Sequence, residues 1–171
     1  MNNEVQLELK KILNSRFSQS ESTRLTYSRG EDTYDPILSK AVVFPESNEE
    51  VSKILKLCNQ HKIPVVPFGT GTSLEGNVVG NEQGITISLE KMNKILSVNV
   101  EDFDCKVQAC VTREQLNEYL REDGVFFPID PGANAAIGGM AATSASGTMA
   151  VKYGTMKTVI SGLTVVLPSG E

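Results

Sequence analysis

Pro64-Val65-Val66-Pro67-Phe68-Gly69-Thr70-Gly71-Thr72-Ser73-Leu74-Glu75-Gly76 is a stiff apolar segment that turns directly into a loop of glycines and hydroxyls. Prolines on both sides of Val65 and Val66 fix φ, and the glycines allow backbone conformations that are closed to other residues. Successive backbone N–H groups and neighbouring hydroxyls can then surround an anion. The stretch therefore predicts a pyrophosphate cradle, the alternative being a glycine loop that serves no ligand.

Two common phosphate loops do not match this spacing. A Walker loop needs a lysine after its last glycine, whereas Gly76 is followed by Asn77. The dinucleotide fingerprint needs a third glycine three residues after the second, where this chain has Leu74. An NTPase and a Rossmann-type dinucleotide site are both disfavoured.

A second stretch rich in small residues follows further along the chain, and it reads Asp130-Pro131-Gly132-Ala133-Asn134-Ala135-Ala136-Ile137-Gly138-Gly139-Met140-Ala141-Ala142-Thr143-Ser144-Ala145-Ser146-Gly147. Side chains this small let a backbone lie flat against a large planar or phosphorylated ligand. Residues 137–142 can begin a short helix whose free N–H groups and dipole favour an anion. The alternative is close packing of that helix on a sheet.

Together these stretches resemble the FAD-binding domain (PCMH type) of the vanillyl-alcohol oxidase superfamily, most closely the branch of D-lactate dehydrogenases and the glycolate oxidase flavin subunit. The resemblance covers about residues 20–171 and includes Ala150-Val151-Lys152-Tyr153-Gly154-Thr155-Met156-Lys157 and Leu163-Thr164-Val165-Val166-Leu167-Pro168-Ser169-Gly170-Glu171. It implies an α+β fold with a small βαβ lobe, about residues 1–80, and a larger mixed-sheet lobe with flanking helices, about 81–171. The ligand is expected between the lobes.

The resemblance also implies which residues bind FAD. Carried over residue by residue, it assigns the pyrophosphate to Pro67, Gly69, Thr70, Gly71, Thr72 and Ser73, with Glu75, Gly76 and Asn77 near the flavin. It assigns the remaining parts of FAD to Pro131, Gly132, Ile137, Gly138, Gly139, Thr143, Ala145, Ser146, Gly147, Tyr153 and Gly154. Superfamily members with covalent flavin use a histidine near position 72 or a cysteine in the second stretch. Neither is present, so non-covalent FAD is expected.

One departure concerns the residues after Lys157, where the family often has an acidic residue and asparagine. This chain has Thr158 and Val159 instead, which removes a polar contact commonly made there.

The activity implied by the resemblance is oxidation of a lactate-like or glycolate-like D-2-hydroxy acid to the 2-oxo acid, with transfer of electrons to an acceptor. No residue of the chain is a convincing general base, so no catalytic residue is assigned. Family members continue past the Pro-x-Gly-Glu end into further strands and a cap, so the domain is expected to be incomplete at its C-terminal end. Two alternatives stay open: a stand-alone flavin- or nucleotide-binding module, and an interaction subunit with a vestigial cradle.

Composition supports a soluble domain of 171 residues, of which 40% are hydrophobic and 22% charged. The net charge of −5 argues against nucleic acid, and no apolar run is long enough for a membrane span. A cytoplasmic protein is expected, with peripheral membrane association of a complete complex left open. One histidine and three scattered cysteines give no metal site. An exposed sheet edge would favour self-association or pairing with the missing C-terminal portion.

Periodicity places helices at about residues 4–17, 48–61, 113–123 and 137–142. Ser47-x-x-Glu50 and Thr112-x-x-Gln115 are the expected N-caps, while His61 and Gly124 mark helix ends. Expected strands are 41–44, 63–66, 85–89, 95–100, 105–111 and 163–167.

Overall fold

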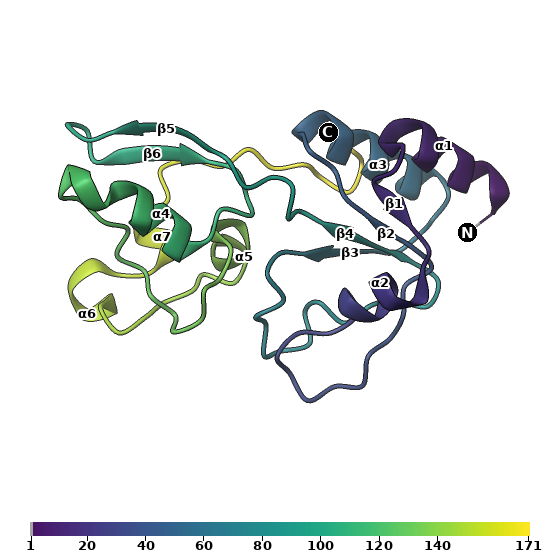
Figure 1. Cartoon of the computed structure of the whole chain (residues 1–171), viewed down its shortest axis with the longest axis horizontal. Coiled ribbons are helices and arrows are strands. Elements are labelled where there is room, and N and C mark those ends of the chain that lie inside the picture. Colours follow the sequence, from purple (N-terminus) through teal and green to yellow (C-terminus); the bar gives the residue numbers. More distant parts are fainter. Residues whose placement is uncertain (1) are drawn as a thin grey trace. The chain divides into compact units, whose positions relative to one another are not determined.

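The computed structural model describes residues 2–171; Met1, with which the expected first lobe begins, lies outside them. The described chain forms two compact units, one containing the residues up to Lys91 together with 164–171, the other residues 92–163. The fold is α+β, as the sequence predicts, with the elements labelled in Figure 1. The first unit extends past the boundary expected near residue 80, because strand β4 (Ile85–Ser88) belongs to its sheet.

The first unit is built on a four-stranded sheet with the strand order β1-β2-β4-β3. Its other strands are β1 (Phe17–Ser18), β2 (Val42–Val43) and β3 (Val65–Phe68), and its helices are α1 (Asn3–Leu13), α2 (Glu21–Thr26) and α3 (Asn48–Gln60). Strand β4 is parallel to both β2 and β3, whereas β1 is antiparallel to β2. The expected βαβ unit is therefore β2-α3-β3 with β4 inserted between its two strands.

Helices α1 and α3 pack together and bury the core of the first unit (Figure 1). The core residues are apolar side chains from both helices and from the sheet: Val5, Leu9, Leu13, Ala41, Val43, Ile54, Cys58, Ile85 and Ile87. The positions on α1 recur at helical spacing, which gives the helix one apolar stripe. Because side chains alternate along β4, Thr86 points away from Ile85 and Ile87, and its hydroxyl donates to Ser39 Oγ at 2.9 Å.

The predicted N-cap of α3 is present. Ser47 Oγ accepts the Glu50 N–H at 3.2 Å, and the helix ends at His61 as expected. The Glu50 carboxylate, however, accepts the Glu46 N–H at 2.8 Å and forms two hydrogen bonds with the Arg16 guanidinium at 2.5 and 2.6 Å. This carboxylate joins α3 to the segment before β1 as well as capping the helix.

The second unit consists of a β-hairpin and short helices. Its elements are β5 (Ile95–Asn99), β6 (Asp104–Val107), α4 (Arg113–Leu120), the 3-10 turn η1 (Arg121–Asp123), α5 (Ile137–Ala142), α6 (Ala150–Tyr153) and α7 (Met156–Val159). The predicted Thr112 cap of α4 is present, and Gly124 ends η1 in the left-handed region at φ 71°. Two apolar clusters form the interior, one around Val111, Leu116 and Leu120 and one around Ile129, Met140 and Met156.

Three sequence predictions need correction. Residues 163–167 do not form the expected strand, since no described strand pairs with their backbone. The side chains of Leu163, Val165 and Leu167 are exposed. The first helix ends at Leu13 instead of residue 17, since Asn14 adopts φ 53° and the chain then enters β1. Strand β6 stops at Val107, where the chain turns toward α4.

Within residues 2–171, no helix combines the length and apolar character needed to cross a membrane.

Candidate cofactor site

The first glycine loop, residues 69–76, begins where β3 ends. Pro67 and Phe68 are the last residues of β3, and the chain bends at Gly69 and Thr70 directly after it. Strand β4 runs parallel beside β3, with Phe68 opposite Ser88. The loop thus leaves the carboxyl edge of a parallel pair, the edge at which such sheets commonly bind ligands.

Two glycines of this loop adopt conformations and contacts that other residues do not tolerate. Gly71 has φ 74°, and a Cβ atom placed on it would lie 2.8 Å from Cζ of the Phe68 ring. Gly76 has φ 70°, and its Cβ would lie 2.8 Å from Cε2 of the Tyr34 ring. The loop is therefore shaped by aromatic rings behind it and presents bare backbone, as an anion cradle requires.

The hydroxyls of the loop lie close together. Thr70 Oγ1 and Thr72 Oγ1 are 3.3 Å apart, and Ser73 Oγ accepts the Glu75 N–H at 3.4 Å. Glu75 and Asn77 are exposed. The hydroxyls of Thr70, Thr72 and Ser73 are neutral donors, which can bind a phosphate without needing a charged partner.

Asp130 organises the start of the second glycine stretch, residues 130–147. Its Oδ1 accepts the Gly132 N–H at 3.0 Å, and its Oδ2 lies 3.5 Å from Arg113 Nη1. Its backbone carbonyl lies so close to Gly147 that a Cβ on that glycine would overlap the oxygen. Gly132 has φ 90°, and Pro131 beside it is exposed. The two ends of the stretch are therefore held together at Asp130.

The N-terminus of α5 uses two of its first amides within the protein. The Ile137 N–H donates to the Val111 carbonyl and the Gly138 N–H to the Ala109 carbonyl, both at 2.8 Å. A Cβ on Gly138 would lie 2.8 Å from the Ala109 Cβ, whereas a Cβ on Gly139 would meet nothing within 4 Å. The geometry gives Gly138 a packing role and leaves Gly139 facing open space.

The remaining predicted residues lie after α5. The Thr143 hydroxyl donates to the Gly139 carbonyl at 3.1 Å, Ala145 donates its N–H to Met140 at 2.9 Å, and Ser146 is exposed. The Tyr153 ring stands edge-on to Phe126, with ring centroids 5.6 Å apart.

Gly154 turns the chain between α6 and α7. It has φ 78°, and its Cβ would lie 2.5 Å from Thr158 Oγ1. Thr158 Oγ1 also accepts the Thr155 N–H at 3.4 Å. Thr158, which departs from the family pattern, therefore packs against Gly154 and accepts a backbone hydrogen bond within this turn.

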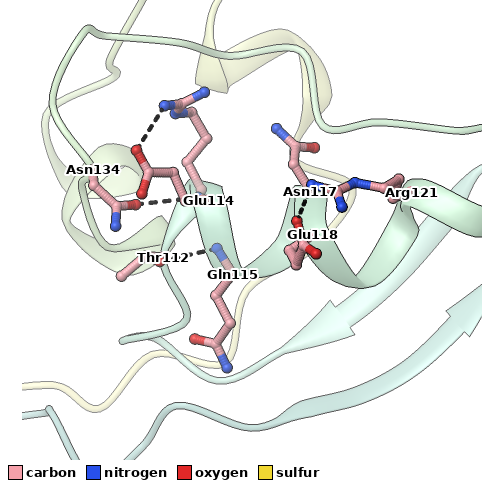
Figure 2. A pocket seen from close by; sticks show the side chains of 8 residues that line it. Thr112, Glu114, Gln115, Asn117, Glu118, Arg121 and Asn134 are labelled. Carbon is pink, nitrogen blue, oxygen red and sulfur yellow. Dashed lines mark hydrogen bonds and ion pairs between the residues drawn. The ribbon is translucent and has the colours of Figure 1, made fainter.

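The described surface also has a hollow of about 730 Å³ along α4 (Figure 2). It is lined by Thr112, Arg113, Glu114, Gln115, Asn117, Glu118, Arg121 and Asn134, and none of the predicted FAD residues is among them. The charges there are paired locally: Arg113 with Glu114 at 3.4 Å, and Arg121 with Glu118. Among residues 2–171, no group of three or more metal-ligating side chains gathers.

A family model described as "FAD binding domain" matches residues 39–171. The chain belongs to the FAD binding domain family. FAD is accordingly its cofactor.

The chain is 48% identical over 153 residues to "Probable D-lactate dehydrogenase, mitochondrial" of Danio rerio, covering 90% of this chain and 31% of the relative. It is 43% identical to "D-lactate dehydrogenase [cytochrome], mitochondrial" of Arabidopsis thaliana, covering 96% and 29%. It is 32% identical to "Glycolate oxidase subunit GlcD" of Bacillus subtilis, covering 91% and 33%. These relatives confirm the resemblance to the D-lactate dehydrogenase and glycolate oxidase branch. The chain spans about a third of the length of each of them.

Among solved structures, alkyldihydroxyacetonephosphate synthase superposes with a TM-score of 0.83 at 24% identity. The match covers 92% of this chain and 33% of that one. It confirms the fold.

The expectation of a cytoplasmic protein is wrong. The zebrafish and Arabidopsis relatives are both named as mitochondrial. Charge and the lack of long apolar runs exclude some classes of protein, but they do not specify a compartment.

Sequence reasoning missed the residues that shape the two glycine segments. Phe68 and Tyr34 lie against Gly71 and Gly76, and the Arg113–Asp130 pair holds the second stretch. Phe68 and Asp130 stand inside the quoted motifs, so position in the sequence could have indicated them. Tyr34 is brought to Gly76 only by tertiary structure.

Proposed function

We propose that the chain is the FAD-binding part of a flavin-dependent oxidoreductase that oxidises a D-2-hydroxy acid to the 2-oxo acid. The observation that carries the proposal is the first glycine loop, with Gly71 and Gly76 at positive φ at the carboxyl end of β3. The names of the relatives supply the substrate class, since those proteins are called D-lactate dehydrogenases and a glycolate oxidase subunit.

The described residues fit FAD. Gly71 is packed against the Phe68 ring on the side where a Cβ would lie, so only its bare backbone can face a ligand, and a Cβ on Gly139 would meet nothing within 4 Å, so the backbone there is open to a ligand. The amides and hydroxyls of residues 69–73 are proposed to bind the pyrophosphate. The exposed parts of the second glycine stretch, with Tyr153, are proposed to contact the planar and ribityl parts. Neither segment contains histidine or cysteine, which supports non-covalent binding.

Bound FAD would supply the hydride acceptor for oxidation of the hydroxyl-bearing carbon. The role of this chain is then to bind and orient the cofactor with neutral donors and to exclude water from the face that it covers. No described residue is assigned as the base that takes the hydroxyl proton. The hydroxy acid and an electron acceptor are the proposed small-molecule and redox partners.

A further proposed partner concerns residues 163–167, which carry exposed Leu163, Val165 and Leu167 and belong to no described strand. We propose that this segment pairs as a strand with a second copy or with another segment of the protein, because an exposed segment with alternating apolar residues favours such pairing. Light scattering of the purified protein would separate the two sources.

The test uses the protein produced from its natural gene. Its visible absorption spectrum is recorded without oxygen before and after addition of D-lactate, D-2-hydroxyglutarate or glycolate, with L-lactate as the matched control. We expect a flavin spectrum that is bleached by at least one of the substrates and unaffected by L-lactate. Flavin should be released on denaturation. A colourless protein that gains no flavin from added FAD would refute the proposal, and flavin that no 2-hydroxy acid reduces would refute the activity.

A further inference from the structure

A segment that precedes the residues matched by the family model lies directly against the first glycine loop. The family model begins at residue 39, whereas residues 27–34, here called the positioning segment, precede it. The Glu31 N–H donates to the Ser73 carbonyl at 3.1 Å, and the Gly80 N–H donates to the Ser28 carbonyl at 3.2 Å. These two backbone hydrogen bonds hold the segment on both sides of Gly76.

The closest approach is at Gly30. A Cβ on this glycine would overlap the Ser73 carbonyl oxygen and would lie 3.0 Å from Val78 Cγ2. The Asp32 carboxylate fixes the turn by accepting the Gly30 N–H at 3.3 Å and the Tyr34 N–H at 3.1 Å. The absence of a side chain at Gly30 therefore permits the contact between the two segments.

Aromatic rings make the second connection. The Tyr27 ring stands edge-on to Phe68, with centroids 5.1 Å apart and planes at 71°, and Phe68 in turn lies against Gly71. The Tyr27 hydroxyl donates to the Glu90 carboxylate, two residues after β4. At the far end of the loop, the Tyr34 ring lies against Gly76. Both left-handed glycines are thus backed by rings that the positioning segment supplies or supports.

We propose that residues 27–34 preorganise the first glycine loop for pyrophosphate, with Gly30 and Tyr27 as positioning residues that act through Ser73 and Phe68. A loop that is already ordered loses less conformational entropy when it binds its ligand. The core of this unit lies between α1, α3 and the sheet, so loosening the segment leaves that core in place. This inference rests on the proposed FAD-binding function.

The test compares Gly30→Ala with Gly162→Ala, whose added Cβ meets nothing within 4 Å. For each variant, dissociation constants of FAD and of riboflavin, which lacks the pyrophosphate, are measured from flavin fluorescence, together with the melting temperature of the apoprotein. Gly30→Ala should raise the dissociation constant of FAD about tenfold. This factor corresponds to the conformational entropy lost when about one extra residue has to be ordered on binding. Riboflavin affinity should stay unchanged, and Gly162→Ala should match the wild type in both.

The possible outcomes separate this inference from the proposed function. A wild type that binds FAD and a Gly30→Ala variant that binds it equally well would overturn the inference and leave the proposed function standing. Equal losses for FAD and riboflavin would also overturn it, because a general folding defect affects both ligands. A wild type that binds no FAD would refute the proposed function itself. If Gly30→Ala does not fold, Tyr27→Leu, which removes the ring contact with Phe68, is tested for the same selective loss of FAD affinity.

Discussion

Replacing Gly71 with alanine imposes two separate costs on the first glycine loop. The backbone is left-handed there at φ 74°, which costs an L-residue about 1–2 kcal/mol. The new Cβ would also lie 2.8 Å from the Phe68 ring, and overpacking of this kind costs about 1–3 kcal/mol. The total of about 2–5 kcal/mol must appear as lower stability, as weaker FAD binding, or as both.

Gly124→Ala is a control for the cost of the left-handed backbone alone. Gly124 has nearly the same φ, 71°, but a Cβ there meets nothing within 4 Å, and no cofactor role is proposed for it. Gly124→Ala should therefore lower the free energy of unfolding by about 1–2 kcal/mol and leave FAD affinity unchanged. The difference between the two variants isolates the contact with Phe68.

Urea denaturation of both variants gives their free energies of unfolding, and FAD titration gives their dissociation constants for FAD. Because the loop is at the surface, we expect Gly71→Ala to shift it away from Phe68 and to lose FAD affinity by about tenfold or more, which is about 1.4 kcal/mol. If Gly71→Ala binds FAD as tightly as the wild type, the loop does not hold the cofactor in the conformation described. Equal FAD losses in both variants would refute the assignment of the effect to this loop.

Three further predictions concern the rest of the chain. The hydrogen bonds from Arg16 lower the pKa of Glu50 from its usual 4.5, so this pair stabilises the fold above about pH 4.5 and the contribution is lost as pH falls through the lowered pKa. Glu50→Gln should therefore reduce the acid dependence of the free energy of unfolding, and an unchanged pH profile in urea denaturation would contradict this. Ile54→Ala should cost about 2–5 kcal/mol in the same assay, because Ile54 is fully buried; a cost under about 1 kcal/mol would mean that the site collapses around the cavity. Burial raises the pKa of the Cys58 thiol to about 11, so iodoacetamide near neutral pH should label the exposed Cys105 before Cys58, and mass spectrometry showing the reverse order would contradict the packing of α3.

Much of the fold is predictable from local pattern because its helices are amphipathic and capped. The oxygen atoms of Ser47 and Thr112 cap α3 and α4 as their spacing predicts. The insertion of β4 between β2 and β3 was not predicted, since strand order depends on pairings that no single segment encodes. The segment 163–167 has a strand-like pattern but no described partner, and a strand forms only where its backbone groups are paired.

The sequence indicates positions in the proposed site where the backbone conformation requires glycine, and the structure bears out that requirement at four of them. Gly71, Gly76, Gly132 and Gly154 all adopt positive φ. Small residues do not by themselves distinguish ligand contact from packing, and Gly138 illustrates this: its close neighbour is Ala109. Such distinctions depend on tertiary neighbours, which the sequence does not display.

A crystal structure of the protein with FAD tests the central claim most directly. The account predicts pyrophosphate oxygens within hydrogen-bonding distance of the amides and hydroxyls of residues 69–73, with the planar parts of FAD against the second glycine stretch. Phosphates bound elsewhere, for example in the hollow along α4, would contradict it.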